Sequence, residues 1–140
     1  MGALTNTLES GLLNHMFRNI TIGSPPTSLK VGLVGTYTAT NLEQGLFTDE
    51  ISGGSYARQT VNADASTWIA PYATGTACAT HNVNTITFPQ ATADIGNVGG
   101  VFITDAGGTM LFYGQLTATR NIRNGDQFVF SSGALKVTFD

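Results

Sequence analysis

Charge is the property that this sequence has least of. Only 11% of its 140 residues are charged, against about 25% in a typical soluble domain. The surface must therefore take its polar cover from uncharged residues, and threonine is the commonest residue in the chain. A sparsely charged surface lacks the self-repulsion that keeps many proteins apart. We therefore expect this surface to be used in contacts with other proteins.

Basic residues and long apolar runs are also scarce. The six Lys and Arg residues are scattered, and the formal net charge is −3, so no cluster exists that would bind phosphates and we expect no nucleic-acid partner. No run approaches the 18 or so apolar residues of a membrane span, and no basic segment precedes the short apolar stretch near the N-terminus. We expect neither membrane insertion nor secretion.

Cysteine occurs once, at Cys78, so an intrachain disulfide is impossible and a reducing compartment suits the chain. Cys78 and His81 form a Cys-x-x-His pair that could supply two zinc ligands, but a structural site needs four. The sequence predicts no metal or other cofactor. The simpler interpretation is a buried small thiol beside a loop histidine.

Catalytic combinations are missing as well. Only His15 and His81 could serve as a histidine base, and neither lies in a pattern typical of a nucleophilic enzyme. Asp49 and Glu50 could be paired with Asp64 as the two acids of a glycosidase, but nothing in their spacing predicts that they converge. We expect no enzymatic activity and no catalytic residues.

What the chain does contain begins with a helical pattern over residues 4–17. Leu8, Leu12 and Met16 recur every four positions, as on one face of an amphipathic helix, and Asn6 with Glu9 resembles a capping box. Such a stripe usually packs on its own domain. The alternative is docking on a partner, which makes this stripe the candidate assembly interface.

Beyond Gly23-Ser24-Pro25-Pro26 the apolar period changes to two, which is typical of strands. We expect a single domain over 1–140, with a helix and lead-in at 1–22 and an all-β, jelly-roll-like sandwich of about seven to nine short strands at 28–140. Residues 37–56 and 70–82 are expected to be loops. Turn residues at 105–108 and 131–133 are expected to close hairpins, and Asn124-Gly125 to form a tight turn. The predicted strands are 29–33, 57–61, 86–88, 98–104, 109–116, 127–130 and 134–139.

Three segments resemble a family of small virion proteins from tailed bacteriophages. They read EISGGSYARQ at 50–59, TFPQATADIG at 87–96 and LFYGQL at 111–116. Members are often labelled tail-fibre proteins, and similar small β domains serve as capsid decoration (cement) proteins that bind over joints between capsid subunits.

The resemblance implies a structural protein on the virion head surface, assembled in the bacterial host cytoplasm as a homotrimer with the major capsid protein as partner. A tail-fibre or baseplate component remains an alternative, as does a carbohydrate-binding adhesin that stacks Tyr56, Trp68 or Tyr72 on sugar rings. For Trp68 a core position is the favoured interpretation, and a small glycosidase is the last alternative.

Glu50, Tyr56 and Arg58 are the candidate loop-organising residues within the first of these segments. Arg58 can pair with Glu50 or Asp49 and so fix the start of the loop. Direct contact with a partner is the alternative role for this arginine.

Overall fold

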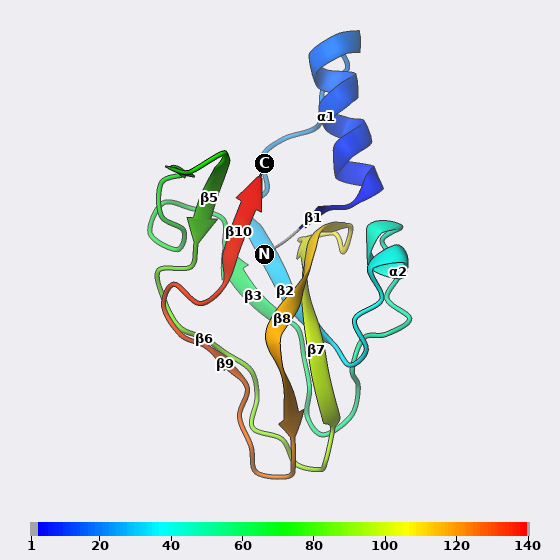
Figure 1. Cartoon of the computed structure of the whole chain (residues 1–140), viewed down its shortest axis with the longest axis vertical. Coiled ribbons are helices and arrows are strands. Elements are labelled where there is room, and N and C mark those ends of the chain that lie inside the picture. Colours follow the sequence, from blue (N-terminus) through cyan, green and yellow to red (C-terminus); the bar gives the residue numbers. More distant parts are fainter. Residues whose placement is uncertain (1–2, 140) are drawn as a thin grey trace.

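A computed structural model of the chain describes residues 3–139. The chain folds into one mainly β body, and one helix stands off at its upper end in Figure 1. The described elements, in chain order, are β1 (Ala3–Leu4), α1 (Asn6–Arg18), β2 (Ser28–Val34), α2 (Ala39–Glu43), β3 (Gln59–Asn62), β4 (Tyr72–Thr74), β5 (Ala77–His81), β6 (Ile86–Thr87), β7 (Gly96–Asp105), β8 (Met110–Ile122), β9 (Val129–Phe130) and β10 (Lys136–Phe139).

Every described strand pair is antiparallel. The largest sheet has five strands in the order β1-β8-β7-β2-β3, and two smaller sheets have the orders β10-β5-β4 and β6-β9. β7 and β8 form a long hairpin closed by Asp105-Ala106-Gly107-Gly108, as expected. A mainly β fold with an N-terminal helix is thus confirmed, while jelly-roll connectivity stays a prediction.

The five-stranded sheet buries side chains on both faces because its strands alternate. Val31 and Leu33 of β2 belong to the main hydrophobic cluster, together with side chains from β6, β9 and β10. Val34 of β2 and Phe102 of β7 belong to a second cluster, completed by Leu42 of α2. The first cluster joins the five-stranded sheet to strands of the two smaller sheets, and the second contains Leu42 of α2 with Phe47 of the following loop packed against it.

A glycine is required at the position on β2 that faces the Phe102 ring of the second cluster. The side chain of Phe102 lies across Gly32, and a Cβ placed at Gly32 would come within 2.1 Å of the Phe102 ring. Gly32 is therefore the residue that lets a fully buried aromatic ring lie against the neighbouring strand.

Several expected loops and links take a different form. Residues 70–82 contain β4 and β5, and residues 37–56 contain α2, so neither segment is the plain loop that its mixed sequence predicts. Ser131-Ser132-Gly133 closes no hairpin, because β9 pairs with β6 and β10 pairs with β5. The links from β8 to β9 and from β9 to β10 each join strands of different sheets.

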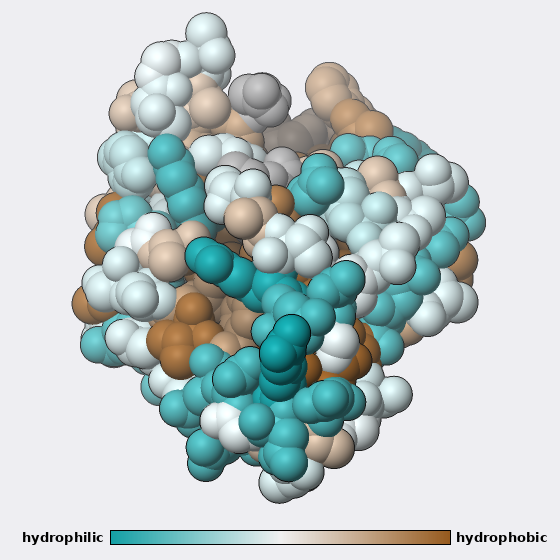
Figure 2. Space-filling model, turned by 60° about the horizontal axis from the view of Figure 1, so that its bottom comes forward, coloured by the Kyte–Doolittle hydropathy of each residue, from teal (hydrophilic) through white to brown (hydrophobic). Residues whose placement is uncertain are grey.

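The exposed surface agrees with the composition. Figure 2 shows a mainly white and teal surface in which hydrophobic groups gather as separate brown patches. Within residues 3–139 no helix is long and apolar enough to cross a membrane.

Candidate assembly surface and loop network

The largest group of exposed apolar side chains lies on α1 and the segment that follows it. No residue of α1 is buried. Six large apolar side chains here are between 36% and 81% exposed: Leu12, Leu13, Met16, Phe17, Ile20 and Ile22. Because contiguous apolar surface of this kind marks interaction sites on folded proteins, this region is the candidate assembly surface.

The base of α1 is fixed to the five-stranded sheet by Thr5. This residue is fully buried. Its N–H donates to the Leu111 carbonyl oxygen at 3.0 Å, and its Oγ1 donates to the Met110 carbonyl oxygen at 2.7 Å. Thr5 is also the N-cap residue, and it makes no side-chain capping bond. The predicted capping box of Asn6 and Glu9 is therefore wrong, because the helix begins one residue earlier and the cap side chain bonds to the sheet instead.

The far end of α1 turns the chain back toward the body. Asn19 takes the left-handed conformation with φ 53°, and its N–H bonds to the Asn14 carbonyl oxygen, as does the N–H of Ile20 at 3.2 Å. A Cβ on Gly11 would lie 3.2 Å from Ile22, so the returning segment passes close to the helix. Residues 6–22, called the arm below, form one unit that stands clear of the sheets (Figure 1).

A groove of about 470 Å³ lies where the arm meets the body. Leu8 and Ile22 line its arm side, Pro25 and Pro26 follow, and Leu111 lines its sheet side. Leu8 is half-buried here, while the side chains further along α1 extend beyond the groove. The arm thus covers its own body only near its base.

The favoured interpretation of the Leu8, Leu12 and Met16 stripe, that it packs on its own sandwich, is wrong beyond Leu8. Leu12 is 36% and Met16 is 72% exposed. The physical reason is that Thr5 anchors only the first turn, so the axis of α1 leaves the sheet and does not lie along it. The alternative interpretation, docking on a partner, remains a prediction.

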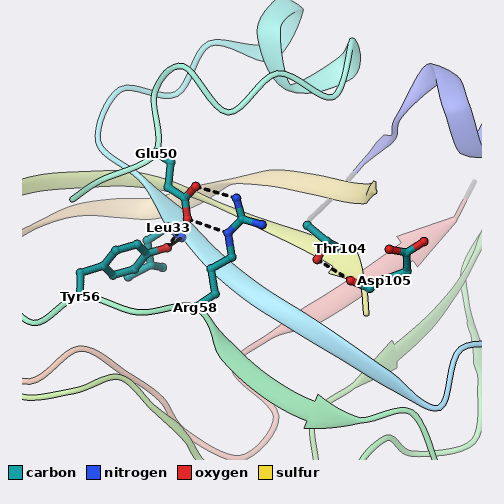
Figure 3. A network of polar contacts seen from close by, with 6 residues as sticks. All are labelled: Leu33, Glu50, Tyr56, Arg58, Thr104 and Asp105. Atoms are coloured by element: carbon teal, nitrogen blue, oxygen red, sulfur yellow. Dashed lines mark hydrogen bonds and ion pairs between the residues drawn. The ribbon is translucent and has the colours of Figure 1, made fainter. Parts of the chain in front are cut away.

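The loop after α2 is held by a second group of residues, shown in Figure 3. Arg58 donates from Nε and Nη2 to the two carboxylate oxygens of Glu50, at 2.8 and 2.7 Å. Tyr56 Oη donates to Glu50 at 2.9 Å and accepts from the Leu33 N–H on β2 at 2.9 Å. Arg58 therefore pairs with Glu50 and not with Asp49, and Tyr56 ties this pair to the sheet.

The environment of this network is apolar on one side. The Arg58 guanidinium lies 4.3 Å from the centre of the Phe47 ring and 4.9 Å from that of Phe102, within reach of cation–π attraction. Burial is the main cause that raises the pKa of the Tyr56 hydroxyl far above its usual value of 10. The hydrogen bond to Glu50 raises the pKa of Arg58. Glu50, Tyr56 and Arg58 therefore serve to hold the loop in place.

The other acidic residues considered for chemistry each have a local partner. Asp49 accepts from the Asn41 side chain at 3.1 Å. Asp64 is exposed and accepts from the hydroxyl and N–H of Ser66 and the N–H of Thr67, which lowers the pKa of its carboxyl. Both carboxylates thus stabilise the loops that carry them.

The Cys78 and His81 pair lies on strand β5, and Cys78 is exposed. The expectation of a buried thiol in a loop is therefore wrong. His81 approaches the Asn82 carbonyl oxygen at 3.1 Å through Nδ1. Within residues 3–139 no three potential metal ligands gather in one place.

The aromatic residues considered for sugar binding lie in different settings. Trp68 is half-buried against the main core cluster and donates from Nε1 to the Asn62 carbonyl oxygen at 3.0 Å. Tyr56 is committed to the network described above, whereas Tyr72 is exposed on β4, with Lys136 Nζ 5.7 Å from its ring centre.

The predicted assembly stripe of Leu8, Leu12 and Met16 leaves out two exposed residues of the assembly surface. They are Leu13 and Phe17, which are 59% and 81% exposed. A helical wheel could have identified them. Leu13 and Phe17 are four residues apart, and they form a second stripe about 100° around the helix from Leu12 and Met16.

The chain matches a family model described as podophage GP4 fiber I protein gp80 over residues 3–138. It confirms the resemblance to small virion proteins of tailed phages. A search of curated proteins finds no match.

Proposed function

We propose that this chain, which belongs to the podophage GP4 fiber I protein gp80 family, is a capsid cement protein. A structural role in the phage virion follows from the family. In the proposal, a homotrimer built on jelly-roll-like sandwiches binds the outer head shell, where it stabilises joints between subunits of the major capsid protein. It does so without enzymatic activity.

The exposed apolar arm carries this proposal. A protein that joins other proteins needs an apolar surface that is exposed in the free subunit and becomes buried when a partner binds. The six exposed apolar side chains of the arm provide such a surface. The low charge of the chain favours the same role, because copies with few surface charges repel one another weakly when they pack closely. Glu50, Asp49 and Asp64 are engaged in loop contacts, which supports a role without catalysis.

A tail-fibre component is the second candidate, and membership of a fibre protein family favours it. The two roles differ in where the protein lies on the particle. Gold-labelled antibody against the protein, applied to purified particles and viewed by electron microscopy, should decorate the head shell if the cement role is right. Labelling confined to the tail would replace it with the fibre role.

A functional comparison completes the test. Particles assembled without the protein should lose their DNA at a lower temperature than complete particles, and adding purified protein back should restore the difference. Particles with unchanged heat resistance and no adsorption to host cells would again favour the tail.

A further inference from the structure

We propose that a groove beside β8 binds a short, extended segment of another protein, in which acidic side chains flank an apolar one. The groove has a volume of about 370 Å³, within the range of about 300–1,000 Å³ typical of ligand sites. One side is formed by residues 115–118 and 120 of β8, and the other by residues 128–130 and 134–136. In Figure 1 the orange β8 and the red chain through β9 and β10 border it. The groove lies apart from the arm, so this inference goes beyond the proposed function and holds for a chain on the head or on the tail.

A wide bulge in β8 forms the first side of the groove. The register between β7 and β8 leaves residues 116–119 opposite Gly99 alone. β1, the other neighbour of β8 in the sheet, pairs with it at residues 112–113, and no described backbone bond outside the strand ladders involves residues 116–119. An added strand binds to a sheet through backbone groups that have no cross-strand partner. The bulge therefore offers such groups to an extended segment.

The floor of the groove is apolar. Val101 and Leu135 are buried, Leu116 and Phe128 are half-buried, and Val129 at the rim is 41% exposed. The Phe128 ring packs edge-on against a second core ring, with the centres 5.1 Å apart, so it is committed to the core. A sugar would need a free aromatic face and many polar groups, whereas this floor suits the apolar side chain of a peptide.

The charge that lines the groove is positive, although the whole chain is acidic. Arg120 and Lys136 line it, and no acidic residue among residues 3–139 does. Lys136 Nζ lies 5.7 Å from the centre of the Tyr72 ring. Arg120 is exposed, and no described side chain bonds to its guanidinium. Asp126, which shares a neighbouring hollow with Arg120, accepts from the Arg123 N–H at 2.9 Å. An unpaired guanidinium favours a carboxylate, to which it can donate two parallel bonds.

The acidic residues of this chain are poorly placed to enter the groove of a second copy. Within residues 3–139, Glu9 and Glu43 lie on α1 and α2. The others accept hydrogen bonds within their own fold: Asp49, Glu50, Asp64, Asp94, Asp105 and Asp126. A different protein is therefore the better source of an acidic side chain on an extended segment.

The test uses the full chain and a display library of random peptides of about seven residues, which span roughly 23 Å when extended. Selection should enrich peptides in which Asp or Glu lies beside an apolar residue. Arg120→Gln should weaken binding of the enriched peptides by about tenfold in fluorescence polarisation. Arg123→Gln removes the same charge just beyond β8, outside the groove, and should leave the affinity unchanged. Both positions are exposed, so circular dichroism should show an unchanged fold.

A second measurement locates the site. Ala118→Cys in a Cys78→Ser background, labelled with a bulky maleimide, should lose peptide binding because the label fills the groove. The same label at Thr7→Cys on the arm should leave binding intact. Selection of no peptide, selection of peptides without acidic residues, equal affinity for Arg120→Gln and wild type, or binding that the label at position 118 does not block overturns the inference.

Two other occupants are separated by the same variants. If Arg120→Gln lowers the oligomer mass measured by light scattering and Arg123→Gln does not, a second copy fills the groove and the inference is wrong. If oligogalacturonate, an acidic sugar chain, displaces the selected peptides at a lower concentration than the free peptides do, the groove is a sugar site and the inference is equally wrong. An unchanged mass and no displacement by the sugar chain support a peptide partner.

Discussion

The ion pair of Glu50 and Arg58 depends on a tyrosine whose hydroxyl has two partners. Tyr56 Oη accepts from the Leu33 N–H and donates to Glu50, so it joins the loop to the edge of a buried strand. Its ring also stacks on Phe88 with the centres 6.1 Å apart. A tyrosine is needed here because phenylalanine would fill the same space and leave two polar groups without this partner.

Tyr56→Phe should change how stability depends on pH. Burial raises the pKa of Tyr56 above 10 in the folded chain, so above about pH 10 the unfolded chain loses this proton while the folded chain keeps it. The contribution is therefore fully present below about pH 10 and is lost as the pH rises beyond it. Tyr56→Phe should cost about 1–2 kcal/mol at neutral pH and should make the alkaline fall shallower.

Urea unfolding at about pH 8 and about pH 11 measures this effect. Some fall should remain in the variant, since burial also raises the pKa of Tyr37 and Tyr113. Tyr72→Phe, at an exposed position on β4, is the matched control and should keep the wild-type fall. An equally steep fall in Tyr56→Phe would show that this hydroxyl ionises freely in the folded state.

For single residues, the sequence predicted the pairing partner of a side chain better than it predicted the burial and distant neighbours of that side chain. It paired Arg58 with one of two neighbouring acids, and the structure shows Glu50. It could not show that Arg58 also lies over Phe102, which is 44 residues further along the chain. It placed Cys78 inside, because small apolar thiols are usually buried, whereas the residue lies on the exposed side of β5.

Among the elements, strong periodicity was reliable and weak periodicity was not. β2 and β7 lie where the sequence predicted strands, and both are buried on both faces over runs of consecutive residues. β4 and β5 contain a single buried residue, Ala79. Their sequences therefore show no apolar alternation from which these strands could be predicted. α1 was predicted from its stripe, but its packing depends on the anchor at Thr5, which no periodicity reveals.

Thr5→Val should loosen the arm. Valine has a similar volume but lacks the hydroxyl that donates to the Met110 carbonyl oxygen, so the variant should lose about 1–2 kcal/mol of unfolding free energy. Hydrogen exchange should become faster in the first turns of α1 and unchanged in β7. Thr7→Val makes the same chemical change at an exposed position and should leave exchange near wild type. Equal exchange in both variants would mean that the hydroxyl does not hold the arm.

For the whole molecule, the sparse charge seen first in the sequence has a consequence for assembly. With only 11% charged residues and a neutral arm, contacts between copies should depend on apolar burial. The mainly β body and its N-terminal helix were both predictable from the sequence. The direction in which the helix leaves the body was not, because it follows from long-range bonds between Thr5 and β8.

The salt dependence of the oligomer should reveal which force holds it together. Interactions between exposed charges are largely screened at about 1 M salt, where the Debye length is about 3 Å, while apolar association is kept, and sulfate strengthens it. We expect the dissociation constant from sedimentation equilibrium to change less than about threefold between about 0.05 and 1 M sodium chloride. Sodium sulfate at equal ionic strength should lower it. Lys30→Gln, which removes a charge from β2 outside the arm, should leave the salt response unchanged. Dissociation at high salt would show that ion pairs join the copies, and the apolar arm would then lose its place as the assembly surface.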